Sequence, residues 1–339
     1  MSDILSLSYI LSGEQDISSL PTVKVESFIQ TLDKPSLQEL IDYLSTKISS
    51  DKENSFYSSF YSYRGLCYRL LELADNSLSD YNEAIYLDPY IGRYYYNRAE
   101  LSFFLLGSSN IAEKISALYD CSKAIEFRDN TNIDYFLFRA SILADLATNP
   151  LMGLKLDGNA NGILYRAVED LNFVITLCPD NVQAYTLRLS CFYSTGEYYT
   201  CIPDCESALK LLDINDDWLK QIKEKDYNTS IPYYIHTLYW YWNALTQIND
   251  LPKANLFKYI YIDTLANQQV YFANEHLLNG RFGEGLQCFE LALDYLNDCS
   301  ALYDSESVEQ STKLNFLLQN FDNKKESVLK SFLVLKDFK

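Results

Sequence analysis

The chain has little glycine and proline, 11 and 8 of its 339 residues. Architectures with many tight turns need both residue types, so this scarcity argues against a β-sandwich or a β-barrel. Apolar residues make up 48% of the sequence, which is ample for a core, and they recur at helical spacing. We therefore expect an all-α fold.

Positive charge is also in short supply. The sequence has 28 lysines and arginines against 46 aspartates and glutamates, which gives a formal net charge of −18. Nucleic acids and anionic membrane surfaces bind to clusters of lysine and arginine side chains, so neither is expected as a partner. A neutral or basic protein partner fits this charge better. The composition leaves open the alternative that the charge only keeps a long chain in solution.

Closely spaced cysteine pairs are absent as well. The sequence contains no Cys-x-x-Cys motif, so it predicts neither a disulfide framework nor a zinc site. No window reaches 18 uncharged apolar residues, and the first residues, MSDILSLSYILSGEQD, lack the basic segment of a secretory signal. A cytoplasmic or otherwise reducing compartment is expected. The eight cysteines are scattered over helical segments: Cys67, Cys121, Cys178, Cys191, Cys201, Cys205, Cys288 and Cys299.

What the chain does contain is an internal repeat. Small and aromatic residues recur in a fixed register with a period near 34 residues, which is typical of stacked helix-turn-helix units. Three units show the register without insertion, at Gly65, Tyr81 and Ala84, at Leu189, Cys205 and Ala208, and at Ala273, Phe289 and Ala292. Two further units, which begin near residues 92 and 133, have longer segments between their helices.

This register resembles that of tetratricopeptide repeat (TPR) proteins, and the resemblance implies an α-α solenoid. The sequence on this basis divides into an N-terminal helical cap (1–55), four TPR units (56–214), a degenerate helical hairpin region (215–265), and a fifth unit with C-terminal capping helices (266–339). Solenoid ends need polar-faced caps, which is the interpretation favoured for both termini. A partner-binding C-terminal tail remains the alternative.

The resemblance also implies a binding surface, because the first helices of TPR units line a concave groove. Large aromatic side chains in such a groove can hold an extended peptide or a partner helix. We expect about half of these rings to pack between helices instead. The residues at groove positions are Tyr63, Tyr96, Asn97, Glu100, Phe103, Phe104, Phe138 and Tyr193.

One TPR subclass binds the C-terminal carboxylate of chaperones through a clamp of lysine, asparagine and arginine. Only Asn97 matches that clamp here. The other positions hold Ser62, Leu66, Asp134 and Phe138, so the sequence does not favour carboxylate-clamp binding of chaperones.

Arginine and aspartate recur together in the first four units. When the residues of each repeat are numbered from its start, as in TPR proteins, position 7 holds an arginine and position 23 an aspartate. The fifth repeat has Phe272 and Cys288 at these positions. A guanidinium in an apolar stripe is costly unless it is paired, so we predict a structural ion pair in each unit or between neighbours. A ladder of arginines that binds anions is the alternative. The predicted pairs involve Arg64, Arg98, Arg139 and Arg188 with Asp80, Asp120, Asp170 and Asp204.

No set of residues points to catalysis, a metal or a cofactor. His236 and His276 are the only histidines, and neither lies near a nucleophile motif. The glycine-rich segment that begins at Gly280 follows no strand and precedes no Lys-Ser/Thr, so it is not a phosphate loop. Cys201 and Cys205 share a helix face but occupy core positions. The sequence thus predicts a non-enzymatic interaction module, with a structural subunit of a larger assembly as the alternative.

Overall fold

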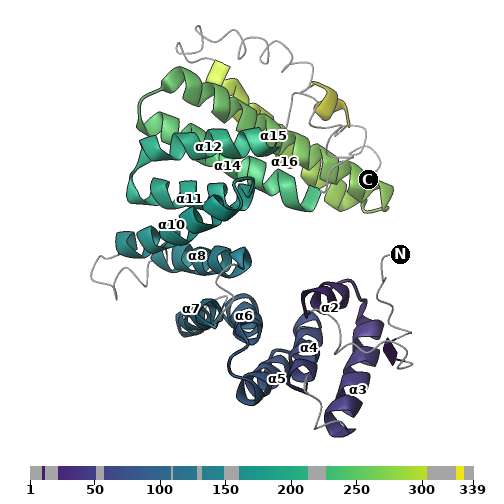
Figure 1. Cartoon of the computed structure of the whole chain (residues 1–339). Helices are drawn as coiled ribbons and strands as arrows, with labels where there is room; N and C mark the ends of the chain where they lie inside the picture. The colour runs from purple at the N-terminus through teal and green to yellow at the C-terminus, as the bar shows by residue number, and fades with distance from the viewer. Residues whose placement is uncertain are drawn as a thin grey trace, which may run out of the picture. The chain divides into compact units, whose positions relative to one another are not determined.

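The computed structural model describes residues 10–11, 22–50, 57–107, 110–127, 132–148, 160–212, 227–303 and 326–331 (Figure 1). Every regular element named within these ranges is a helix, which confirms the all-α prediction. The chain divides into two compact units, residues 1–173 and 174–339. The predicted C-terminal caps fall mostly outside the described ranges.

The first unit begins with two helices that precede the repeats, α2 (Thr22–Ile29) and α3 (Lys34–Ser50). The repeat helices that follow are α4 (Tyr57–Leu70), α5 (Ala74–Leu87), α6 (Gly92–Leu101), α7 (Ile111–Glu126) and α8 (Ile133–Thr148). A π-helical segment, η2 (Ser102–Leu106), extends α6. The boundary between the units falls within α10 (Ala160–Leu177).

The core of the first unit starts in the helices before the repeats. Leu40 and Leu44 of α3 belong to the same buried cluster as Phe60 of α4. Their i, i+4 spacing places the two leucines on one helical stripe. The α3 helix therefore packs against α4, the first helix of the first repeat.

The second unit consists of α11 (Val182–Thr195), α12 (Tyr198–Leu212), α14 (Tyr227–Gln247), α15 (Leu251–Leu278) and α16 (Phe282–Tyr303). Gly196 ends α11 in the left-handed conformation, with φ of 84°, which a glycine adopts without steric cost. It allows the tight turn from α11 into α12.

One helix crosses the sequence-based boundary between residues 265 and 266. The end of the degenerate hairpin and the first helix of the fifth unit form the single helix α15. No glycine or proline occurs between Pro252 and Gly280. Without a turn residue the backbone hydrogen-bond ladder has no reason to stop, so the helix continues.

Candidate protein-binding face

Seven of the eight predicted groove residues lie in the first unit, on α4, α6, η2 and α8, and we call the surface that they define the first-helix face. Four of them are buried by contacts within the chain, and two, Glu100 and Phe103, are partly buried. Phe104 is the exposed one, with 60% of its surface accessible. The buried four are Tyr63, Tyr96, Asn97 and Phe138.

Four of these rings form an aromatic cluster, which consists of Tyr96, Phe103, Phe104 and Phe138. Phe138 lies at its centre, with ring centroids 5.6 Å from Tyr96, 5.5 Å from Phe103 and 5.6 Å from Phe104. The Phe104 and Phe138 rings are stacked at an interplanar angle of 16°. Phe104 is thus held in place on one side of its ring and open to solvent elsewhere.

The π-helical segment η2 explains why two successive phenylalanines reach the same neighbour. Residues i and i+1 of an α-helix point in directions about 100° apart, and a π-type turn widens that helix locally. Phe103 and Phe104, both in η2, each pack against Phe138. Such turns occur frequently at functional sites.

A buried carboxylate on α2 reaches the first-helix face. The side chain of Glu26 is 2% exposed, and its Oε2 accepts a hydrogen bond of 2.6 Å from Nε of Arg93. Its Oε1 accepts a hydrogen bond of 2.8 Å from Nδ2 of Asn97, which also reaches Ser62 at 3.3 Å. Asn97 is therefore not free to act as an isolated clamp residue. Glu26 is not among the residues that the sequence predicts for this face, although an acid one position after Val25 and three before Ile29 was the available signal.

Glu100, another predicted groove residue, is also paired. Its Oε2 lies 3.1 Å from Nη2 of Arg69, one repeat earlier. Burial raises the pKa of Glu100, and the positive charge of Arg69 opposes that rise. This pair links α4 to α6 and leaves Glu100 less available to an outside partner.

Tyr193, the remaining predicted groove residue, belongs to the second unit. Its ring lies 5.1 Å from Tyr198 and 4.8 Å from Trp240, so it joins a separate aromatic group on α11, α12 and α14. The side chain is partly buried. Tyr193 is therefore not part of the first-helix face.

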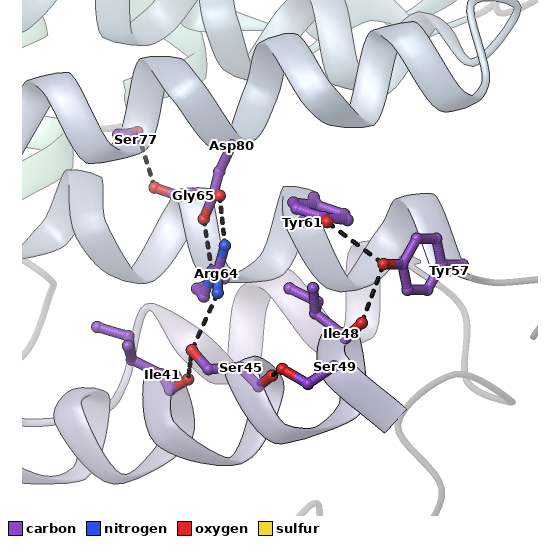
Figure 2. A network of polar contacts seen from close by, with 10 residues as sticks. All are labelled: Ile41, Ser45, Ile48, Ser49, Tyr57, Tyr61, Arg64, Gly65, Ser77 and Asp80. Carbon is purple, nitrogen blue, oxygen red and sulfur yellow. Dashed lines mark hydrogen bonds and ion pairs between the residues drawn. The ribbon is translucent and has the colours of Figure 1, made fainter. Parts of the chain in front are cut away.

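The four predicted arginine–aspartate partners lie against each other. In every pair Nε and Nη2 of the arginine donate to the two oxygens of the aspartate, as Figure 2 shows for Arg64 and Asp80 at 2.8 and 2.7 Å. The other three pairs have the same fork at 2.6 to 2.8 Å. The aspartate side chains are 1 to 8% exposed and the arginines 18 to 22%. A guanidinium bound in this way has little capacity left for an outside anion.

Each of these arginines also lies near an aromatic ring three residues earlier in the chain. The guanidinium carbon is 5.5 Å from the ring centroid in the first repeat and 5.7 Å in each of the next three repeats, which is within cation–π range. In the fifth repeat Gln269 occupies the position of the aromatic ring. The ring, the arginine and the aspartate are therefore all replaced in that repeat. The rings are Tyr61, Tyr95, Phe136 and Tyr185.

No protein-family model and no curated protein matches the sequence. Solved structures do match. The C-terminal part of a TPR repeat-containing protein from Cytophaga hutchinsonii aligns with a TM-score of 0.50 at 12% identity, over 87% of this chain and 98% of that one. The chain has the TPR fold. A TPR protein from Parabacteroides merdae aligns over 85% of this chain and 97% of that one, with 13% identity and a TM-score of 0.47.

Cysteine thiols and possible metal ligands are the remaining polar groups within this fold. Burial raises the pKa of the thiols of Cys67, Cys191 and Cys201 to about 12, so they stay protonated and inert near neutral pH. Within the described ranges, no three His, Cys, Asp or Glu side chains gather in a way that could hold a metal ion. None of the helices in those ranges has the length and apolar character that crossing a membrane requires.

Proposed function

We propose that this chain is a non-enzymatic protein-interaction module that binds a peptide or helix of another protein on the first-helix face. The observation that carries the proposal is Phe104, a large apolar ring that is exposed yet fixed by stacking on Phe138. Rigid aromatic side chains are favoured as interface anchors, because they bury a large area and lose little conformational entropy.

The proposed partner is a protein segment of neutral or basic overall charge. The net charge of −18 favours such a partner through long-range attraction and disfavours nucleic acid and anionic membranes. Two clamp positions hold Asp134 and Phe138 in place of bases, so we do not propose carboxylate-clamp binding of chaperones. No cofactor enters the proposal. The cysteines in the described ranges are free thiols, as expected in a reducing compartment, and we propose the cytoplasm.

A second candidate function is a structural subunit of a larger assembly. Exposed tyrosines on second helices favour it, because the first-helix face would leave them unused. Tyr86 on α5 is 80% exposed, Tyr119 on α7 is 58% exposed and Tyr199 on α12 is 74% exposed. In this alternative the second helices carry permanent contacts.

Replacing Phe104 by alanine is expected to distinguish the two functions. Peptides selected from a displayed random library against the full-length chain should bind the Phe104→Ala variant about tenfold more weakly or worse, since an anchor contributes about 1–2 kcal/mol. Fluorescence anisotropy with synthetic peptides measures the dissociation constants. Circular dichroism should not change, because the ring is mostly exposed.

The matched control is Tyr119→Ala, which removes a similarly exposed ring from the second helix of the same repeat. We expect the selected peptides to bind it as they bind the wild type. Peptides that lose affinity with Tyr119→Ala, and keep it with Phe104→Ala, would overturn the first-helix proposal and favour the assembly subunit.

A further inference from the structure

Helix α2 packs against the first unit through one polar and three apolar side chains, of which Phe28 is partly buried. Val25, Glu26 and Ile29 are its buried residues, whereas Lys24 faces solvent. Val25 and Ile29 belong to the same core cluster as Tyr63 of α4. Ile29 follows Val25 by four residues and Glu26 by three, so the three side chains lie on one face of the helix. An amphipathic helix that binds in the groove of a partner protein places its anchors in the same way.

The carboxylate of Glu26 is held as a ligand carboxylate would be. Arg93 and Asn97 are both on α6, and they bind the two oxygens of Glu26 from one side. The guanidinium of Arg93 also lies over the ring of Tyr96, 4.9 Å from its centroid. Since Tyr96 contacts Phe138, the carboxylate site is continuous with the aromatic cluster that contains Phe104.

The contact of α2 is incomplete at its first turn. A pocket of about 300 Å³ lies there, lined by Thr22 and Val23 of α2 and by residues that include Gly92, Arg93 and Tyr135. Val23 at its wall is 62% exposed. A longer or bulkier segment would therefore bury more surface on this face than α2 does.

The energetics of the Glu26–Arg93 pair favour exchange. A buried ion pair contributes little net stability, because both charges lose hydration when they meet, and that hydration is regained when the pair separates into water. A helix of eight residues is also too short to be stable alone, so α2 depends on its contacts. Once those contacts are broken, the covalent link still keeps α2 near the site, at an effective concentration of about a millimolar.

We propose that α2 is an internal ligand, which a partner helix of the same chemistry displaces from Arg93 and Asn97. The matching partner segment carries one glutamate or aspartate with aliphatic residues one position before it and three positions after it. This inference rests on the proposed function and names its partner class. A segment such as α2 itself, with one lysine and one glutamate, is neutral overall and so agrees with the proposed partner charge.

The test uses the full-length chain and a labelled synthetic peptide of residues 20–33. In the Glu26→Lys variant the new cation faces Arg93, so α2 should leave the face and vacate the site. We expect the peptide to bind this variant about tenfold or more tighter than the wild type, in which the tethered helix competes. The same peptide with glutamine at position 26 should lose that gain, and so should the wild-type peptide with a Glu26→Lys/Arg93→Gln double variant.

Lys24→Glu is the matched control, because it changes a charge on the exposed side of the same helix. It should bind the peptide no better than the wild type. Hydrogen exchange supplies a second readout: amides of α2 should exchange faster in Glu26→Lys, while amides of α4 and α6 keep their protection. Glu26→Gln, which conserves shape, replaces Glu26→Lys in both measurements if the latter fails to fold.

Two outcomes would overturn the inference. One is loss of protection that spreads through α4 and α6 in the variant, which would make α2 a permanent part of the core. The other is a folded variant with loosened α2 that still does not bind the peptide. Library peptides that depend on Phe104 would survive either outcome, so failure of this inference is distinguishable from failure of the proposed function.

Discussion

Replacing Asp120 by alanine is expected to lower the free energy of unfolding by about 2–4 kcal/mol, because it leaves a largely buried guanidinium without its carboxylate. The Asp120 side chain is 1% exposed and accepts two hydrogen bonds of 2.8 Å from Arg98. The side chain of Arg98 is 22% exposed, so water recovers part of the loss. Urea unfolding followed by circular dichroism measures the change.

Glu126→Ala is the control on the same helix. Glu126 pairs with Lys123 at 2.7 Å, but its side chain is 60% exposed, and a surface pair of this kind contributes about 1 kcal/mol or less. An Asp120→Ala variant as stable as Glu126→Ala would show that the repeated pairs contribute no more than surface pairs do. It would also reopen the interpretation of the arginines as an anion-binding ladder.

The ion pairs were predictable because the repeat fixes their geometry. Positions 7 and 23 lie on the two helices of one hairpin. Each repeat that contains both residues therefore supports the same predicted ion pair. Their joint replacement by Phe272 and Cys288 adds a negative case. An aromatic residue also recurs three positions before each of these arginines. Its contact with the guanidinium depends on side-chain direction, which spacing alone does not specify.

The exposure of the predicted groove residues could not be read from the repeat register. Family positions say which side of a helix a residue occupies, but not what else packs there. The α2 helix precedes the repeats and has no place in their register, yet Glu26 binds Asn97 and Val25 shares a core cluster with Tyr63. Likewise, the π-type turn at Phe103 and Phe104 alters the direction of side chains without any change in sequence spacing.

Replacing Gly65 by leucine is expected to lower the free energy of unfolding by about 3 kcal/mol, through overpacking at the crossing of α4 and α5. A β-carbon at Gly65 would lie 2.9 Å from the ring of Tyr81 and 3.3 Å from Cβ of Asp80. Tyr81 is completely buried, so its ring has little room to move. Any shift of α5 would also disturb the fork between Asp80 and Arg64.

The matched control is Gly283→Leu, at a helical glycine where an added β-carbon meets nothing within 4 Å. It should leave stability unchanged or raise it slightly, since leucine favours helix more than glycine does. Circular dichroism during urea unfolding follows both variants. The three tryptophans, Trp218, Trp240 and Trp242, all lie in the second unit, so their fluorescence reports on the unit that Gly65→Leu leaves untouched. Wild-type stability of Gly65→Leu would contradict the close contact between α4 and α5 and, with it, the register in which the repeats are aligned.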